Sequence, residues 1–205
     1  MELLLVRHAL PVRRELEVGV ADPELSEDGH AQAKLLAGYL NAERLDAIYA
    51  SPLRRAQQTA EPVAEGAGLE IVLEPAVAEW DQHSNEYVPI EELKANDDPR
   101  WQAMVRGEWT SHDETPEQFN ARIVGALERI IAEHRGGRVA VVCHGGVING
   151  YLAHVLGLRE HSFFYPNYTS IHRVAAASTG ERSIVTVNET THLRGSGLPI
   201  GLFQR

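Results

Sequence analysis

The chain has 205 residues, of which 43% are hydrophobic and 23% are charged, and its formal net charge at pH 7 is −10. This length and composition fit one compact domain with a substantial core, and the negative charge argues against a large binding surface for nucleic acid or an anionic membrane, since those partners require an extended basic field. The single cysteine, Cys143, cannot form an internal disulfide, and the apolar run at residues 3–6 is too short for a signal peptide or a membrane span, so we expect a cytoplasmic protein.

The N-terminal part of the chain predicts a strand, a helix and a second strand. Residues 3–6 are uninterruptedly apolar, which is typical of a strand covered on both faces in a parallel sheet. Ser26 predicts an N-cap, because two acidic residues follow it in the first helical turn, and we expect the helix to reach about residue 40. Residues 47–50 predict the second strand.

A second helix and a third strand follow. Ser51 and Pro52 predict the N-cap and the first-turn proline of a helix that carries two arginines near its positive end. We expect Pro62 to kink or end this helix, because proline lacks the N–H that the helical hydrogen bond needs. Residues 71–77 predict the third strand.

The clearest helix signal lies in the second half of the chain. Residues 115–118, Thr-Pro-Glu-Gln, form a capping box with proline at the first helical position, and the helix is expected to continue to about residue 133. Its apolar residues recur at helical spacing and form one face: Phe119, Ile123, Leu127, Ile130 and Ile131. Two glycines end it before a strand at 139–143, and residues 170–176 and 183–188 predict a closing strand pair.

The predicted elements alternate as β-α-β-α-β, then pass through an irregular and partly helical stretch, and finish as β-α-β-β. Because the chain contains no repeat, low-complexity tract or evident linker, this order predicts a three-layer α/β/α sandwich in a single domain over residues 1–205. In such folds the chemistry gathers at the carboxyl ends of the strands, where side chains and helix amino termini point into one crevice.

Three of the predicted strand ends carry cationic residues. Arg7 and His8 follow the first strand, residues 51–55 with two arginines follow the second, and His144, Gly145 and Gly146 follow the strand at 139–143. Two arginines and two histidines at one pocket would suit a phosphate group, because guanidinium makes paired hydrogen bonds to phosphate oxygens. The two glycines would let backbone N–H groups approach the anion at a helix start.

Six motifs carry a resemblance to a known family: "LLLVRHA", "ELSEDGHAQA", "ASPLRRAQQTA", "AVAEW", "VCHGGVIN" and "VNETTHL". In these residues, which run from the N-terminus to about residue 193, the chain resembles the histidine phosphatase superfamily, which includes the cofactor-dependent phosphoglycerate mutases and related phosphatases. The resemblance implies a phosphoglycerate mutase-like fold, in which a mostly parallel mixed sheet contains one antiparallel strand.

The same resemblance implies roles for five side chains. His8 would be the nucleophile that becomes phosphorylated, Arg7, Arg55 and His144 would surround the phosphate, and Glu79 would donate a proton to the leaving oxygen. Only a neutral imidazole nitrogen can attack, and a covalent intermediate divides a very slow hydrolysis into two easier displacements. Fixed cations can stabilise the charge that spreads over the phosphoryl oxygens, so this chemistry requires no metal and no cofactor.

Several of these assignments have competitors. Glu79 could be structural, because Glu74 and Asp81 lie close by in the sequence and either could act as the acid. Glu79 would also need a pKa near the working pH, since it must be protonated in the first step and ionised in the second. Arg54 is expected to face outward beside Arg55.

The segments that differ from the family bear on the substrate. Ala9 stands where the family usually has glycine, and residues 10–14, Leu-Pro-Val-Arg-Arg, replace a threonine and an asparagine of the usual phosphate contacts. Arg13 and Arg14 are either solvated loop charges or contacts to a second anionic group of the substrate, and His83 could touch substrate as well. Residues 80–83 do not resemble the segment with which mutases hold phosphoglycerate.

These differences and the short chain favour a phosphatase that hydrolyses the phosphomonoester of a small phosphorylated metabolite through a phosphohistidine. Mutase-type phosphoryl transfer and a catalytically silent module that binds phosphorylated ligands are the alternatives. A metallohydrolase has less support, because the sequence contains no HExxH-like motif and no Cys/His ligand cluster.

An insertion at about 80–115, with Tyr87, Trp101 and Trp109, is expected to form a cap over the pocket, where its aromatic side chains contact substrate or simply pack the cap. The expected partner is a small phosphorylated substrate, not nucleic acid or membrane. A homodimer is compatible with the sequence, which leaves the oligomeric state open.

Overall fold

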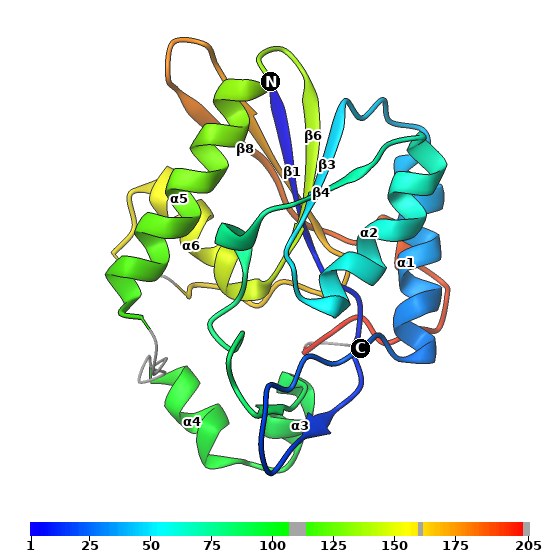
Figure 1. The fold of residues 1–205 in the computed structure, drawn as a ribbon, viewed down its shortest axis with the longest axis vertical. Helices are drawn as coiled ribbons and strands as arrows, with labels where there is room; N and C mark the ends of the chain where they lie inside the picture. Colours follow the sequence, from blue (N-terminus) through cyan, green and yellow to red (C-terminus); the bar gives the residue numbers. More distant parts are fainter. Residues whose placement is uncertain (107–113, 160–161, 203–205) are drawn as a thin grey trace.

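The computed structural model describes residues 1–106, 114–159 and 162–202. Within these residues a six-stranded sheet lies between two layers of helices, and a two-stranded sheet and two short helices lie at one end of it (Figure 1). The elements in chain order are β1 (Glu2–Arg7), β2 (Arg14–Glu15), α1 (Glu27–Leu40), β3 (Ala47–Ala50), α2 (Arg54–Ala67), β4 (Ile71–Leu73), the 3-10 helix η1 (Pro75–Val77), β5 (Glu86–Tyr87), α3 (Ile90–Ala95), α4 (Pro99–Val105), α5 (Pro116–Glu133), β6 (Arg138–Cys143), α6 (Gly145–Leu156), β7 (Ile171–Ala176), β8 (Arg182–Glu189) and the 3-10 helix η2 (Thr191–Leu193).

The large sheet has the strand order β4-β3-β6-β1-β7-β8. Strands β4, β3, β6 and β1 pair in parallel, whereas β7 is antiparallel to both β1 and β8. Since β8 opposes β7, it runs in the direction of β1, and β7 is the one strand of this sheet that runs the other way. The prediction of a three-layer sandwich with a mostly parallel mixed sheet is confirmed.

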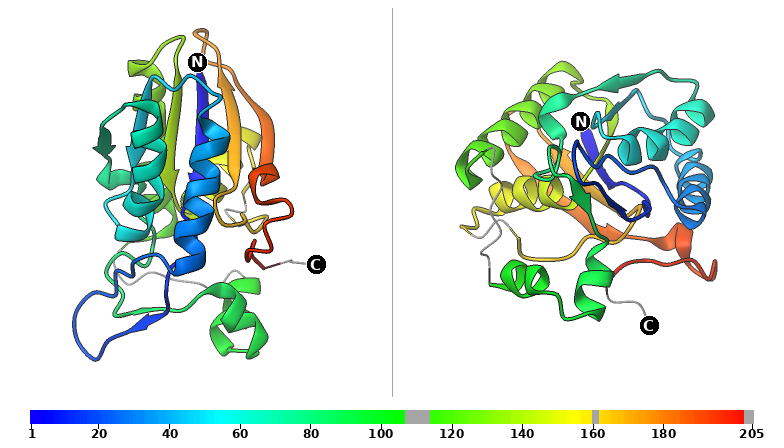
Figure 2. Two further views of the ribbon diagram at one scale, coloured as in Figure 1. Left: turned by 90° about the vertical axis from the view of Figure 1, so that its right-hand side faces the viewer. Right: turned by 60° about the horizontal axis from the view of Figure 1, so that its bottom comes forward.

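The central strand β1 shows why its apolar run is uninterrupted. Leu3 and Leu5 pack into a core cluster with α5 and α6, while Leu4 and Val6 pack into a second cluster with α1 and α2. All four side chains are fully buried. Because successive side chains of a strand point to opposite faces, a strand between two helix layers needs apolar residues at every position. Figure 2 shows the strands between these layers.

The start of α2 corrects the prediction made from Ser51 and Pro52. The helix begins at Arg54, and Leu53 occupies the N-cap position. The hydroxyl of Ser51 accepts a hydrogen bond from the Leu53 N–H at 3.3 Å and is also bonded to a histidine of the candidate site. The carboxylate of Asp22, from a distant loop, accepts the Arg54 N–H at 3.0 Å. The cap is therefore supplied by tertiary structure, which the local sequence does not reveal.

Pro62 does not end α2 either. The helix continues to Ala67 and stops at Gly68, which adopts the left-handed conformation with φ of 67°. Proline removes one helical hydrogen bond, but Val63 and Ala64 on the same helix are buried against the sheet. This packing keeps the helix continuous, since most helix stability in proteins comes from such tertiary contacts.

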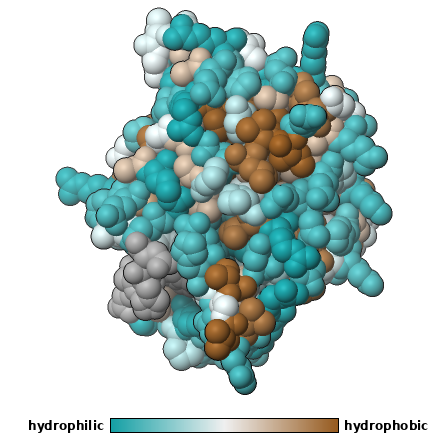
Figure 3. Space-filling model, viewed as in Figure 1, coloured by the Kyte–Doolittle hydropathy of each residue, from teal (hydrophilic) through white to brown (hydrophobic). Residues whose placement is uncertain are grey.

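Strand β4 is shorter than the predicted 71–77. It ends at Leu73, because the side chain of Glu74 accepts the N–H of Ala76 at 2.9 Å and Pro75 opens the 3-10 turn η1. Val72 and Leu73 are each 48% exposed, and Figure 3 shows hydrophobic surface over this edge of the sheet. The short length of β4 limits pairing with the edge of another sheet.

The segment predicted to form a cap contains β5, α3 and α4. Strand β5 pairs with β2, with Arg14 opposite Tyr87, so the loop after His8 belongs to the same substructure. We call β2, β5, α3 and α4 the cap. The cap lies across the end of the sheet at which β1, β3 and β6 finish (Figure 2). Trp101 lies 5.6 Å from the Tyr165 ring, centroid to centroid, whereas Trp109 is outside the described residues.

None of the described helices has the length and apolar character needed to cross a membrane.

Candidate active site

His8 follows the last residue of β1 and is 3% exposed. Its backbone N–H donates to the carbonyl of Cys143 at 2.9 Å, which fixes it beside the end of β6. Its Nδ1 lies 2.8 Å from the carbonyl oxygen of Ala9. A carbonyl oxygen can only accept, so Nδ1 carries the proton of this bond and Nε2 keeps a free electron pair.

Arg7 is held by the loop before β7. Its Nη1 donates to the carbonyl of Pro166 at 2.5 Å, and the guanidinium carbon lies 4.1 Å from the centroid of the Tyr168 ring. That ring also lies 6.1 Å from the ring of His8. Stacking on an aromatic face and a carbonyl bond orient the guanidinium without neutralising its charge.

Arg55 stands in the first turn of α2 and is 1% exposed. Its Nη2 donates to Asp81 at 2.7 Å, and its guanidinium carbon lies 4.7 Å from the centroid of the Tyr87 ring in the cap. Thr59 fixes this turn against the loop that follows β1, because its hydroxyl donates to the Arg55 carbonyl at 2.6 Å and accepts the Ala9 N–H at 2.9 Å.

His144 occupies the N-cap position of α6, after the end of β6. Its ring lies 5.1 Å from the ring of His8, centroid to centroid, and its Nε2 lies 2.7 Å from the hydroxyl of Ser51. Burial holds the pKa of both histidines well below the ordinary value of 6.5, and Arg55 and Arg7 lower both values further. His8 is therefore neutral at pH 7, which is the form that can act as a nucleophile.

Polar atoms without a hydrogen-bond partner gather around His8. Among the described residues, buried and unpartnered nitrogens include Nε of Arg7, Nε of Arg55 and Nδ1 of His144. Buried polar groups are normally satisfied, so a set of unsatisfied nitrogens at one place is a feature to be explained. A phosphoryl group has three oxygens that can accept such bonds, and this arrangement can hold it in front of His8 Nε2.

Glu79 faces the start of α6. Its Oε2 accepts the N–H of Gly146 at 2.7 Å and its Oε1 accepts the N–H of Trp80 at 3.0 Å. A Cβ on Gly146 would lie 2.3 Å from Oε1 of Glu79, so only glycine permits this approach. Burial raises the pKa of Glu79 above its ordinary value of 4.5, and the charge of Asp81 raises it further. A raised pKa is what a carboxyl group needs to donate a proton near neutral pH.

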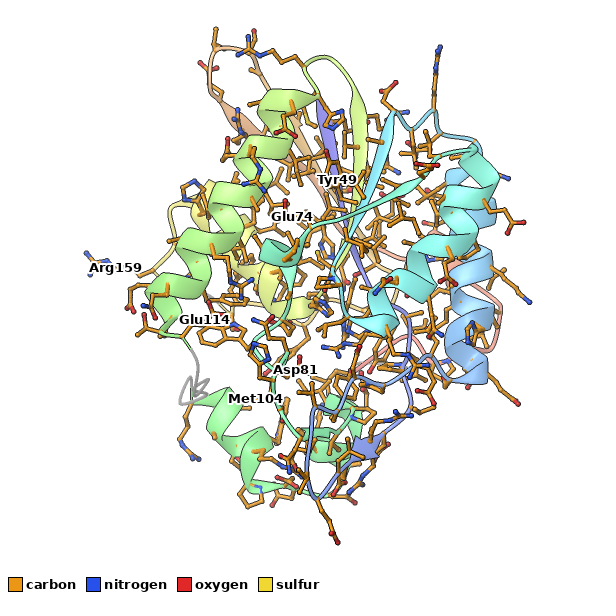
Figure 4. All side chains as sticks on the ribbon, in the orientation of Figure 1. Tyr49, Glu74, Asp81, Met104, Glu114 and Arg159 are labelled. Carbon is orange, nitrogen blue, oxygen red and sulfur yellow. The ribbon has the colours of Figure 1, made fainter. Side chains whose placement is uncertain are left out.

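The two other acidic candidates have different partners. Glu74 caps η1 and forms an ion pair with Arg129 on α5. Asp81 is paired with Arg55. In Figure 4 Asp81 lies between the sheet and the cap helices, whereas Glu74 lies further along the sheet, away from the cap. The geometry favours Glu79 as the acid.

Arg13 and Arg14 both pair with carboxylates. Arg13 is half exposed and is bonded to Glu15 and to Glu92 of α3, while Arg14 donates to Glu24 at 2.7 Å. Arg54 is exposed, as expected, and shares Glu24. A contact of Arg13 or Arg14 with substrate stays a prediction.

His83 is exposed in the turn before β5. Its contact with substrate also stays a prediction. Gly145, predicted to contact the anion, is the first residue of α6, and a Cβ there would meet no other atom within 4 Å.

Sequence reasoning missed several residues that surround the site. Tyr87 and Tyr168 stack on the two arginines, Asp81 holds Arg55, and Thr59 joins α2 to the loop that follows β1. The sequence indicates only Asp81, as an alternative acid, and Tyr87, as an aromatic residue of the cap. The missing signal was tertiary contact, since Tyr168 lies far in sequence from Arg7, and Thr59 lies far from Ala9, whose N–H it accepts.

A metal centre is not evident in the described part of the chain, where no group of three or more His, Cys, Asp or Glu side chains is arranged to hold an ion.

Comparison with known proteins identifies the family. The model of the histidine phosphatase superfamily (branch 1) matches residues 3–190. The chain belongs to the histidine phosphatase superfamily. Phosphoserine phosphatase 1 of Hydrogenobacter thermophilus is 33% identical over 206 residues, covering 94% of each chain, and a probable phosphoglycerate mutase GpmB of Yersinia enterocolitica is 29% identical, covering 79% of this chain and 78% of the relative.

Solved structures share the fold. YhfR of Bacillus stearothermophilus superposes with a TM-score of 0.76 at 24% identity, covering 94% of this chain and 99% of that one. A mutant phosphoserine phosphatase of Entamoeba histolytica, in complex with phosphoserine, gives a TM-score of 0.72 at 24% identity, covering 94% of this chain and 98% of that one. The predicted family and fold are confirmed, and so is the prediction of a phosphatase of the histidine type.

Proposed function

We propose that this histidine phosphatase hydrolyses phosphomonoesters of small metabolites through a phosphohistidine formed on His8. The observation that carries the proposal is the state of the His8 ring, with Nδ1 bonded to the Ala9 carbonyl and Nε2 free beside two buried guanidinium groups. A purely binding site needs the cations but has no use for a neutral imidazole with a free electron pair.

In the first step Nε2 of His8 attacks phosphorus and the bond between phosphorus and the ester oxygen breaks. Glu79 gives its proton to that oxygen, so the alcohol leaves in neutral form. Arg7, Arg55 and His144 stabilise the charge on the three equatorial oxygens, which is where it accumulates in a loose phosphoryl-transfer transition state.

In the second step water attacks the phosphohistidine, the bond between nitrogen and phosphorus breaks, and inorganic phosphate is formed. Glu79 is now ionised and takes a proton from the water. The same carboxyl group can serve in both steps because its pKa is raised toward neutrality by burial.

The relatives indicate the class of substrate to test first. Phosphoserine phosphatase 1 of H. thermophilus matches 94% of this chain, whereas the probable mutase GpmB of Y. enterocolitica matches 79% at lower identity. A neighbour in structure is a mycobacterial glucosyl-3-phosphoglycerate phosphatase, with a TM-score of 0.71. Phosphoserine and 3-phosphoglycerate are therefore the first metabolites to test.

The test is turnover of p-nitrophenyl phosphate in the presence of EDTA, with wild type, His8→Ala and His30→Ala. His30 is an exposed histidine of α1 and controls for the substitution itself. We expect turnover and an acid-labile, base-stable phosphoenzyme after rapid quench in wild type and His30→Ala. His8→Ala should show neither, with activity reduced by about 10³-fold or more.

The other outcomes point to other functions. Conversion of 3-phosphoglycerate to 2-phosphoglycerate without release of phosphate would indicate a mutase. Binding of phosphorylated ligands with neither turnover nor phosphoenzyme would indicate a silent binding module, and loss of activity in EDTA would indicate a metallohydrolase.

A further inference from the structure

Glu91 is a cap residue that reaches the candidate active site. It lies in the first turn of α3, and its Oε2 accepts the hydroxyl of Tyr168 at 2.8 Å. The Tyr168 ring lies against the guanidinium of Arg7 and 6.1 Å from the ring of His8. Burial lowers the pKa of Arg7, but nearby acidic groups, first the Tyr168 and Tyr87 hydroxyls and then Glu91, raise it overall. Glu91 is therefore connected through Tyr168 to Arg7 and His8.

The second carboxylate oxygen of Glu91 has no partner. Its Oε1 is buried and receives no hydrogen bond from any described residue. A buried carboxylate oxygen without a donor costs free energy, so it calls for a compensating contact. The natural complement of such an oxygen is an N–H donor, above all a cationic one.

The other two carboxylates near the arginines are already committed. Glu79 accepts two backbone N–H groups, and Asp81 is paired with Arg55. Of these three carboxylates, only Glu91 has a buried oxygen that receives no hydrogen bond from the described residues. A carboxylate at Glu91 would repel the phosphate dianion of a substrate. It would favour binding only of a substrate that also carries a positive charge.

We propose that Glu91 determines specificity by accepting a hydrogen bond from an ammonium group of the substrate, and that the preferred substrates are phosphate monoesters of small amino compounds. This inference rests on the proposed phosphatase function. The phosphate of the substrate lies before His8, with its ammonium group at Oε1 of Glu91, on the Arg7 and Tyr168 side of the pocket. Phosphate esters that carry a hydroxyl in place of the ammonium group lose this contact.

Two metabolites of nearly the same shape test the inference. L-Phosphoserine and 3-phosphoglycerate differ in an ammonium group against a hydroxyl on the second carbon, so their kcat/KM ratio reports recognition of that group. We expect wild type to prefer phosphoserine. Glu91→Gln keeps an oxygen for the Tyr168 hydroxyl but removes the charge, and should lower kcat/KM for phosphoserine about 10- to 100-fold. The value for 3-phosphoglycerate should stay the same or rise.

Glu92→Gln is the matched control, because Glu92 is the next residue of α3, and its side chain is 42% exposed and pairs with Arg13. It should leave the ratio of the two kcat/KM values unchanged. If Glu91→Gln lowers kcat/KM equally for phosphoserine and 3-phosphoglycerate, Glu91 only positions Tyr168 and Arg7, and the inference is overturned. A wild type with no preference for phosphoserine would overturn it as well.

Turnover of p-nitrophenyl phosphate separates this failure from failure of the proposed function. If Glu91→Gln melts at the wild-type temperature and still forms the phosphoenzyme from p-nitrophenyl phosphate, the variant is folded and its ratio is informative. If wild type forms no phosphoenzyme from any ester, the phosphatase function itself fails. If Glu91→Gln does not fold, Glu91→Asp, which keeps the charge on a shorter side chain, should retain the sign of the preference.

Discussion

At the scale of single residues, one carbonyl group decides which nitrogen of His8 can react. The Ala9 oxygen holds the proton on Nδ1, and burial together with Arg55 and Arg7 keeps the ring neutral. Arg7 and His8 could be predicted because both lie at the end of an apolar strand in the local sequence. The side chains that orient the arginines, Tyr168 and Asp81, could not, since they come from distant segments.

The proposed role of Glu79 as the acid gives a prediction that depends on the leaving group. Glu79→Gln cannot donate a proton, so an alkyl phosphate, whose alkoxide is a poor leaving group, should lose about 10²-fold or more in kcat/KM. p-Nitrophenyl phosphate, which leaves readily as an anion, should lose less than about 10-fold. Steady-state kinetics with both esters is the measurement, and equal losses for the two would count against Glu79 as the acid.

At the scale of elements, the amino end of α6 and the turn after η1 fit together through one glycine. The N–H of Gly146 donates to Glu79, and its missing side chain leaves space for the carboxylate and for Trp80. Trp80 in turn stacks on Phe119 of α5, with ring centroids 4.3 Å apart. The turn that carries Glu79 is thus held by two helices of the same layer.

Replacement of this glycine should damage catalysis more than folding. In Gly146→Ala the new Cβ would lie 2.3 Å from Oε1 of Glu79 and 3.0 Å from Trp80, so the carboxylate must move. We expect kcat to fall about 10- to 100-fold and the free energy of unfolding to fall by about 1–3 kcal/mol, as for overpacked sites.

Gly125→Ala is the control for this substitution. Gly125 lies on the exposed side of α5, where a Cβ would meet nothing within 4 Å. Since alanine favours helices over glycine, stability should rise by about 0.5–1 kcal/mol with unchanged kcat. Wild-type kcat in Gly146→Ala would show that Glu79 does not depend on its contact with α6.

At the scale of the whole molecule, the parallel strands bring His8, Arg55 and His144 to one end of the sheet. This convergence was predictable, because strands that alternate with helices along the chain run parallel and end at the same edge of the sheet. The cap was predicted only as a segment, for two physical reasons. Strands β2 and β5 have two residues each, which is too short to show a periodic pattern, and their pairing depends on the docking of the loop after His8.

Burial of neutral histidines under this cap couples stability to pH. Burial lowers the pKa of His172 to about 3, and it lowers the pKa values of His8 and His144 well below 6.5. Below pH 6.5 the unfolded chain protonates these three histidines while the folded protein does not, so the unfolded state binds more protons and stability falls as the pH falls. Glu79, with a raised pKa, acts in the opposite direction, but it contributes at most one proton.

Urea denaturation at pH 7 and pH 5 measures this coupling. Each fully buried neutral histidine should lower the free energy of unfolding by about 2 kcal/mol between these values, a large part of the roughly 5–15 kcal/mol that stabilises a domain. Carboxylates with lowered pKa values, such as Glu43 and Glu189, contribute little to the change between pH 7 and pH 5. Their stabilising contribution is lost mainly below their ordinary pKa of 4.5. In His8→Ala the free energy of unfolding should decrease less between pH 7 and pH 5 than in wild type, because the unfolded chain takes up one proton fewer. Equal stability of wild type at pH 7 and pH 5 would mean that these histidines are not buried in neutral form.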